Sequence, residues 1–294
     1  MTSRSRTRTP RSPPCAGSSV TCPRTAASLL PAASPAPPGW SDPELAQLVP
    51  ERRRRAYDMR HVLRRLVDDG DFLELRPGVG RGLITALARL DGMPVGVIAS
   101  QPLYQAGSLE PDACDKATRL VCLCDAFGLP LVLLQDTPGF LVGQKVEHAR
   151  LLHKAMLFQQ ALVLAGVPKL TVVLRKAFGL AFFSLGGSGM GSDFLAAWPG
   201  AEIGFMDPEV AANVLMGGQV AELPPEEKRA QLQAVAGRIA SATDPYGAAT
   251  IMGLDEVIAP EDTRAVLVRQ LRLHAEAPFQ PGDLRPLSTW PTCW

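Results

Sequence analysis

The sequence is poor in cysteine and has none at the spacing of a zinc site. The 294 residues include 6 cysteines: Cys15, Cys22, Cys114, Cys122, Cys124 and Cys293. No pair reads Cys-x-x-Cys, and none is joined by histidine at a zinc spacing. His148 and His153 are five positions apart, about 140° around a helix, so they do not share one metal-binding face. We therefore expect free thiols, a reducing compartment and no bound metal.

The chain also lacks an excess of charge and a long hydrophobic run. Lys and Arg number 30 against 29 Asp and Glu, so the net charge of +1 gives no basic field for nucleic acid. No run approaches the roughly 18 apolar residues that a membrane span needs. The hydrophobic content of 46% is enough for a globular core. These properties predict a cytoplasmic protein that binds neither nucleic acid nor a membrane.

Common motifs of nucleotide binding and serine hydrolysis are absent. No Gly-x-x-x-x-Gly-Lys-Ser/Thr loop occurs, and the run from Gly187 to Gly191 lacks Gly-x-Gly-x-x-Gly spacing. The same run places Met190 where the Gly-x-Ser-x-Gly elbow of hydrolases requires glycine. We expect no nucleotide bound by this chain and no serine nucleophile.

The composition changes near residue 40. Residues 1–40 are rich in Arg, Pro, Ser and Ala, and no acidic residue precedes Asp42. This predicts a disordered tail or linker remnant, because the prolines would break the amphipathic helix of a transit peptide. We divide the chain into this tail, a linker at 41–57, an ordered domain at 58–280 and a C-terminal tail at 281–294.

From residue 58 onward, apolar strands alternate with amphipathic helices. Asp91-Gly92 between two apolar runs predicts a two-residue hairpin, in which Pro94 favours an edge strand. The alternation favours an α/β fold, a mixed sheet covered by helices. The expected strands are 72–75, 83–90, 93–99, 130–135, 169–175 and 201–206. The expected helices are 58–68, 147–165, 224–241, 261–275, one running from Pro111 to Gly128 and one opened by Asp207, and 136–143 is expected to be a loop.

Two strand exits are the best candidates for chemistry. One runs from Asp136 through Pro138-Gly139-Phe140, and the other from Arg175 through Phe178-Gly179. Backbone N–H groups that converge between a strand and a helix can bind a developing oxyanion, and glycine allows close approach. The alternative is that both are simply tight turns of a helix-covered sheet.

Short motifs in order along residues 41–277 resemble the C-terminal half of the biotin-dependent acyl-CoA carboxylase carboxyltransferase β subunit, propionyl-CoA carboxylase type. The motifs are Tyr57-Asp58-Met59-Arg60, Asp69-Gly70-Asp71-Phe72-Leu73-Glu74, Gly92-Met93-Pro94-Val95-Gly96, Asp112-Ala113-Cys114-Asp115-Lys116-Ala117, Asp136-Thr137-Pro138-Gly139-Phe140, Arg175-Lys176-Ala177-Phe178-Gly179 and Trp198-Pro199-Gly200-Ala201-Glu202. The resemblance implies a crotonase-like (ClpP/crotonase) fold, a repeated ββα superhelix.

The resemblance also implies an activity and partners. The family moves CO2 from carboxybiotin to the α-carbon of an acyl-CoA, and this chain would supply the biotin-side half site. Biotin would be carried by a separate carrier subunit, because the chain has no Met-Lys-Met biotinylation segment. The implied partners are the biotin carboxylase and biotin carrier subunit, an N-terminal carboxyltransferase half, the acyl-CoA and further copies of this chain in a homo-oligomer.

Carried over residue by residue, the resemblance implies a backbone oxyanion site at Gly179, Leu180 and Ala181. The residues implied to contact biotin or substrate are Pro138, Gly139, Phe140, Phe178 and Phe183. The family's Tyr-Gly-Gly-Ala-Tyr is Phe-Gly-Leu-Ala-Phe at 178–182, so the N–H donor survives only if Leu180 keeps a negative φ. Phe183 matches a position that lines the acyl pocket, although simple core packing is the alternative.

Three functions are compatible with these residues. The first is a split carboxyltransferase that is inactive without an N-terminal half. The second is a truncated, non-catalytic or scaffold subunit of such a complex, and the third is a crotonase-type acyl-CoA decarboxylase relative that works alone. The acyl group is not identified by the sequence.

Overall fold

In a computed structural model of the chain, residues 41–275 are described, and the predictions for 1–40 and 276–294 lie outside them. The core is one mixed sheet in the order β1 (Phe72–Glu74), β2 (Leu83–Leu90), β3 (Met93–Ser100), β4 (Leu131–Thr137), β5 (Lys169–Phe178), β6 (Phe194–Ala197) and β8 (Glu256–Val257). A further strand, β7 (Glu202–Gly204), pairs with the end of β5. The pairs β1–β2 and β2–β3 are antiparallel, and all later pairs are parallel.

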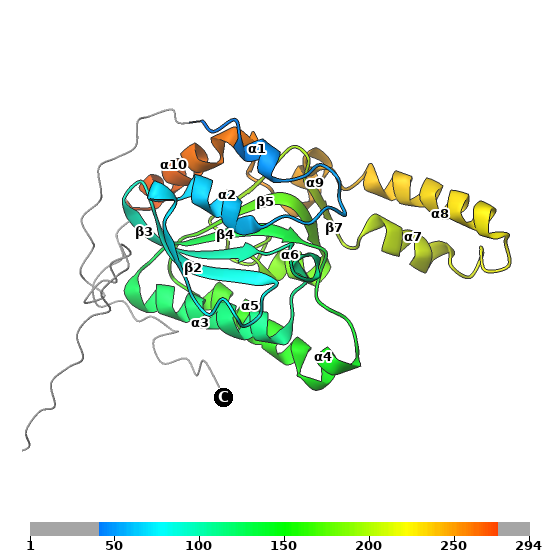
Figure 1. The fold of residues 1–294 in the computed structure, drawn as a ribbon, viewed down its shortest axis with the longest axis horizontal. Helices are drawn as coiled ribbons and strands as arrows, with labels where there is room; N and C mark the ends of the chain where they lie inside the picture. Colours follow the sequence, from blue (N-terminus) through cyan, green and yellow to red (C-terminus); the bar gives the residue numbers. More distant parts are fainter. Residues whose placement is uncertain (1–40, 276–294) are drawn as a thin grey trace, which may run out of the picture.

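Helices cover both faces of the sheet (Figure 1). The helices α1 (Leu45–Leu48), α2 (Met59–Leu66) and α10 (Thr263–Ala275) share one apolar cluster with the sheet, and α3 (Pro111–Phe127) and α5 (Leu151–Leu164) share the other. Successive residues of β4 explain this, since Val132 packs in the first cluster and Leu133 in the second. The expected α/β fold, a mixed sheet between helices, is confirmed.

The hairpin forms at the predicted place. Asp91 and Gly92 have φ of 54° and 75°, as the favoured two-residue turn requires. The edge position inferred from Pro94 is wrong, because β3 lies between β2 and β4. Pro94 is tolerated there because β4 pairs with β3 only from Gly96 onward, so its missing N–H leaves no bond to β4 unmade.

Several boundaries differ from the prediction. The expected helix 147–165 is two helices, α4 (Gln144–His148) and α5, broken where Arg150 takes a φ of 60°. The expected strand 201–206 is shorter, and β6 was missed because its four apolar residues follow directly on a glycine-rich turn. The sequence did not predict α9 (Pro245–Met252). Helix α10 begins after a 3-10 turn at Pro260–Asp262.

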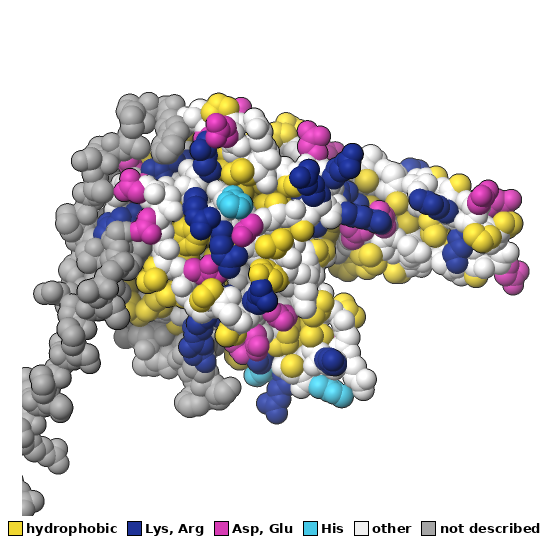
Figure 2. All heavy atoms as spheres, in the orientation of Figure 1, with side chains coloured by type: hydrophobic (Ala, Val, Ile, Leu, Met, Phe, Trp, Pro, Cys, Tyr) yellow, Lys and Arg dark blue, Asp and Glu magenta, His cyan; other side chains and the backbone are white. Residues whose placement is uncertain are grey.

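A pair of helices extends from the body of the molecule (Figure 1). We call α7 (Pro208–Met216) and α8 (Pro225–Ala240) the helical arm, and they pack against each other. Val214 and Leu215 on α7 are 69% and 64% exposed, and α8 has no buried residue. Figure 2 shows hydrophobic side chains on the surface of this arm. Exposed apolar surface of this kind marks contact surfaces.

Candidate functional site

The two candidate turns lie side by side at the carboxyl edge of the sheet. Strands β4 and β5 are parallel, and Thr137 pairs with Ala177. The segments that follow, Pro138-Gly139-Phe140 and Phe178-Gly179, therefore leave the sheet next to each other. This is the edge at which open α/β sheets place their ligands.

Gly179 begins α6 (Gly179–Ser184) and occupies a conformation that suits glycine. Its φ is 57°, and a Cβ added to it would lie 2.9 Å from the carbonyl oxygen of Phe205. The first N–H groups of a helix have no acceptor within that helix. Those of Gly179, Leu180 and Ala181 are in this position at the start of α6.

Leu180 meets the condition on which its N–H donor depends. It is not among the residues with positive φ, and it continues α6 directly after Gly179. Its side chain is 42% exposed, whereas Ala181 is buried. Replacing the family's second glycine with Leu180 therefore leaves the backbone of the turn intact, and the oxyanion role of these N–H groups stays a prediction.

Hydrogen bonds made by the backbone of Gly139 hold the loop after β4 in place. The Gly139 N–H donates to Thr137 Oγ1 at 3.2 Å, and the Gly139 carbonyl accepts from the N–H of Leu109 at 3.0 Å. Gly139 has a φ of 137° and an added Cβ would meet nothing within 4 Å. Pro138 is half-buried, and the half-buried Phe140 ring packs against the α3–α5 cluster.

The aromatic residues of the predicted site differ in their exposure. Phe178 is 2% exposed, so its ring belongs to the core and only its backbone lies along the turn. Phe183 is half-buried, and its ring meets that of Phe182 edge-on at 5.2 Å between centroids. It also packs beside a small cluster that includes Ala248. A half-buried ring with these contacts is compatible with both interpretations of Phe183, acyl pocket and core packing.

Asp136 and Arg175 belong to the two strand exits and to the family motifs, and the sequence did not predict the contact between them. The Arg175 Nε donates to Asp136 Oδ2 at 3.0 Å, and both side chains are buried. Burial raises the pKa of Asp136, and the nearby charges of Arg175 and Lys176 oppose that rise. The register of β4 and β5 was the signal that could have found this pair, because charged residues end both strands.

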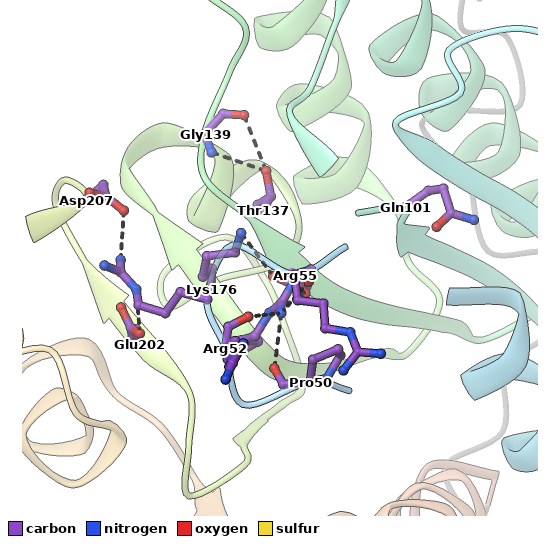
Figure 3. Close-up of polar contacts among 12 residues, drawn as sticks. Pro50, Arg52, Arg55, Gln101, Thr137, Gly139, Lys176, Glu202 and Asp207 are labelled. Carbon is purple, nitrogen blue, oxygen red and sulfur yellow. Dashed lines mark hydrogen bonds and ion pairs between the residues drawn. The ribbon is translucent and has the colours of Figure 1, made fainter. Parts of the chain in front are cut away.

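Arg175 also binds the backbone of residues 50–55. Its Nη1 donates to the carbonyl oxygens of Pro50, Arg52 and Arg55 at 3.1, 3.2 and 2.9 Å. Figure 3 labels these three acceptor residues, which lie close to Lys176. Its guanidinium lies 5.1 Å from the centre of the Tyr57 ring. Residues 50–57 are therefore held at the ends of β4 and β5.

A pocket of about 250 Å³ opens between this segment and the strand ends. Its walls include Arg53, Arg55, Pro138 and Lys176, with Asp207 from the start of the helical arm. Lys176 is 7% exposed, and burial lowers the pKa of its ammonium group. The pocket thus adjoins a predicted substrate-contacting residue, Pro138.

Within residues 41–275 no three His, Cys, Asp or Glu residues are grouped so as to hold a metal ion. Over the same range, every helix is too short or too polar to cross a membrane. Cys114 and Cys124 are buried free thiols, and Cys122 is buried as well.

Comparison with known proteins identifies the family. The carboxyl transferase domain profile matches residues 20–284. The chain belongs to the carboxyl transferase domain family. It is 39% identical over 233 residues to the methylmalonyl-CoA carboxyltransferase 12S subunit of Propionibacterium freudenreichii subsp. shermanii, covering 79% of this chain and 44% of that protein. It is also 39% identical over 243 residues to the propionyl-CoA carboxylase beta chain of Saccharopolyspora erythraea, covering 81% and 44%.

Solved carboxyl transferases share the fold. The transcarboxylase 12S hexamer with hydrolysed methylmalonyl-CoA bound has a TM-score of 0.81 at 35% identity, over 90% of this chain and 50% of that one. The geranyl-CoA carboxylase beta subunit of P. aeruginosa has a TM-score of 0.75 at 26% identity, over 87% and 50%. The expected crotonase-like carboxyltransferase fold is confirmed. This carboxyl transferase chain spans about half the length of the curated relatives it matches.

Proposed function

We propose that the chain is the biotin-side component of a split acyl-CoA carboxyltransferase. The observation that carries the proposal is the meeting of the Pro138-Gly139 turn with the start of α6, where Thr137 and Ala177 are paired. In this proposal the chain corresponds to the C-terminal half of its relatives, and a separate N-terminal half holds the acyl-CoA.

The chain's own groups fit a carbonyl oxygen that gains negative charge. The N–H groups of Leu180 and Ala181 follow Gly179 at the start of α6 and have no acceptor within it. A carrier-bound biotin, when present, supplies the carboxyl group to be transferred. The protein's contribution is to orient the ureido oxygen and stabilise its developing charge, and loss of one such donor typically costs about 3 kcal/mol in activation free energy.

We further propose that the chain works as a homo-oligomer with a biotin carrier partner. The exposed apolar side chains of the helical arm support an assembly, and Phe205 at its base is 83% exposed. The buried free thiols Cys114 and Cys124 fit our placement of the protein in the cytoplasm.

The test is transfer of label from carboxylated biotin carrier to an acyl-CoA, with this chain alone, an N-terminal half alone and the two together. We expect transfer only in the mixture. Several acyl-CoAs should be compared, because the chain does not identify the acyl group. Transfer by this chain alone would contradict the split arrangement, and no transfer from folded samples would favour the scaffold function.

A decarboxylase role has one supporting observation. The chain is 36% identical over 228 residues to the methylmalonyl-CoA decarboxylase subunit alpha of Propionigenium modestum. A second assay that starts from a labelled carboxylated acyl-CoA separates the two functions, since a decarboxylase releases its label as CO2.

A further inference from the structure

The pocket at the ends of β4 and β5 is lined by Lys176, whose ammonium group donates no hydrogen bond to any described residue. Among the described residues, the Lys176 ammonium has one carboxylate oxygen within ion-pair distance, Asp136 Oδ1 at 3.9 Å. That separation is too long for a hydrogen bond. The residue is 93% removed from solvent, and its Nζ is not one of the fully buried polar atoms that lack a partner, so the ammonium faces the pocket. Lys176 lines the pocket, so its donors are available to a group inside it.

The neighbouring charges are already paired. Arg53 bonds Glu202 and Asp207, each at 2.7 Å. Arg54 bonds Glu209 at 2.5 Å. Arg175 bonds Asp136 and the carbonyls of residues 50–55. In the described part of the pocket lining, this leaves Lys176 and Arg55 as the cations without a hydrogen-bonded carboxylate.

The pocket walls limit what anion can enter. Apolar surface comes from Ala56, Pro102, Ala106 and Pro138, which favours an anion carried on a carbon skeleton. Asp207 and Glu209 also line the pocket, and each is paired with an arginine. Phosphate has no carbon skeleton to contact the apolar walls, so we expect it to bind more weakly than an organic carboxylate. A volume of about 250 Å³ admits the head of a ligand but not a whole acyl-CoA.

We propose that this pocket binds an organic carboxylate group, with the Lys176 ammonium as its principal ligand and Arg55 at the entrance. Lys176 precedes Gly179 by three residues, a separation of about 10 Å along an extended chain. The pocket therefore lies near the start of α6 along the chain, and its lining does not include Gly179, Leu180 or Ala181. The carboxylate has two possible sources, the N-carboxyl group of the donor or the carboxyl group of a carboxylated acyl-CoA. The identity of the source rests on the proposed function, whereas binding itself does not.

The test is anion binding to the full chain, followed by amide shifts in ¹H–¹⁵N NMR spectra at constant ionic strength. Propionate is the carboxylate probe and inorganic phosphate the comparison. We expect saturable shifts at residues 53–56 and 176–177 with propionate, and at least tenfold weaker binding of phosphate. Freshly prepared N-carboxybiotin methyl ester and methylmalonyl-CoA then distinguish the two sources, by which of them displaces propionate.

Three variants localise the site. Lys176→Met should weaken propionate binding at least tenfold, and Lys176→Arg should restore most of it. Lys116→Met is the matched control, because Lys116 is also buried but its ammonium donates to the carbonyl of Val79. If Lys176→Met does not fold, the rate at which cyanate carbamylates Lys176 in the wild-type chain replaces it. Bound propionate should slow this carbamylation.

Unchanged binding in folded Lys176→Met, absence of both shifts and protection, or phosphate binding as tight as propionate would overturn the inference. Propionate binding without transfer in the reconstituted mixture would retain the pocket and contradict the proposed function. Transfer without propionate binding would contradict the pocket and retain the proposed function.

Discussion

Arg175 and Asp136 form a buried ion pair across the adjoining ends of β5 and β4, with 3.0 Å between Nη2 and Oδ2. The same guanidinium binds three carbonyl oxygens of residues 50–55. Arg175 therefore connects residues 50–55 to the edge of the sheet where both candidate turns lie. The shape of the pocket beside Lys176 depends on this connection.

Replacing Arg175 should lower the free energy of unfolding. Arg175→Met leaves the Asp136 carboxylate buried without its partner, and breaking a buried pair in this way costs about 3–5 kcal/mol in free energy of unfolding. Urea denaturation measures this loss of free energy of unfolding. The control is Arg269→Met, because Arg269 pairs with Glu256 and the two side chains are 53% and 40% exposed. Loss of such an exposed pair should cost less than about 1 kcal/mol. Equal effects in the two variants would show that burial of the Arg175 pair is not what matters.

Gly179→Ala should disturb the start of α6. The new methyl group meets the carbonyl oxygen of Phe205 at 2.9 Å in a backbone with a φ of 57°, so the turn must shift or carry about 1–2 kcal/mol of strain. We expect at least a tenfold loss of kcat in the reconstituted transfer assay. Gly200→Ala is the control, because a Cβ there meets nothing within 4 Å. Full activity of folded Gly179→Ala would argue against the backbone oxyanion site.

Phe183→Ile separates the two interpretations of that residue. If Phe183 lines the acyl pocket, the ratio of kcat/KM between a short and a long acyl-CoA should change about tenfold or more, as changes of a few methylenes in a pocket do. If Phe183 only packs beside Phe182, the ratio should stay constant while the free energy of unfolding falls. Measuring both quantities on the same preparation decides between them.

Lys116 should give the free energy of unfolding a characteristic pH dependence. Burial lowers its pKa to about 8, below the value of about 10.4 for an unfolded lysine. Between these values the unfolded chain binds the proton and the folded chain does not, so the contribution of Lys116 to stability rises with pH. Urea denaturation at pH 7.5 and 9.5 should show the wild type gaining relative to Lys116→Arg, whose side chain stays charged throughout. A constant difference would contradict the lowered pKa.

The helical arm should contribute to assembly. Val214 and Leu215 are largely exposed in the single chain, and burying such side chains stabilises contacts by roughly 1.5–3 kcal/mol each. Val214→Lys combined with Leu215→Lys should therefore reduce the mass measured by light scattering after gel filtration. Gln231→Lys on the exposed side of α8 is the control for added charge. An unchanged mass in the double variant would place the interface elsewhere.

Local signals in the sequence determined most of the fold. Asp91-Gly92 fixed the hairpin, because only residues that tolerate positive φ form that turn. Pro111 and Gly128 fixed the ends of α3, since proline suits the first helical turn and Gly128 ends the helix with a φ of 70°. The alternation of strands and helices determined the α/β class, and the ordered motifs determined the family.

Only the tertiary structure decided which of these residues meet. The parallel pairing of β4 and β5 brings Asp136 to Arg175, 39 positions away, and Arg175 to the carbonyls of residues 50–55. Four-residue β6 escaped prediction because its pairing with β5 and β8 supplies its stability. The pocket likewise depends on five segments that are distant in sequence, so no single stretch of the chain could predict it. Long-range register, which local periodicity does not encode, positions the candidate site.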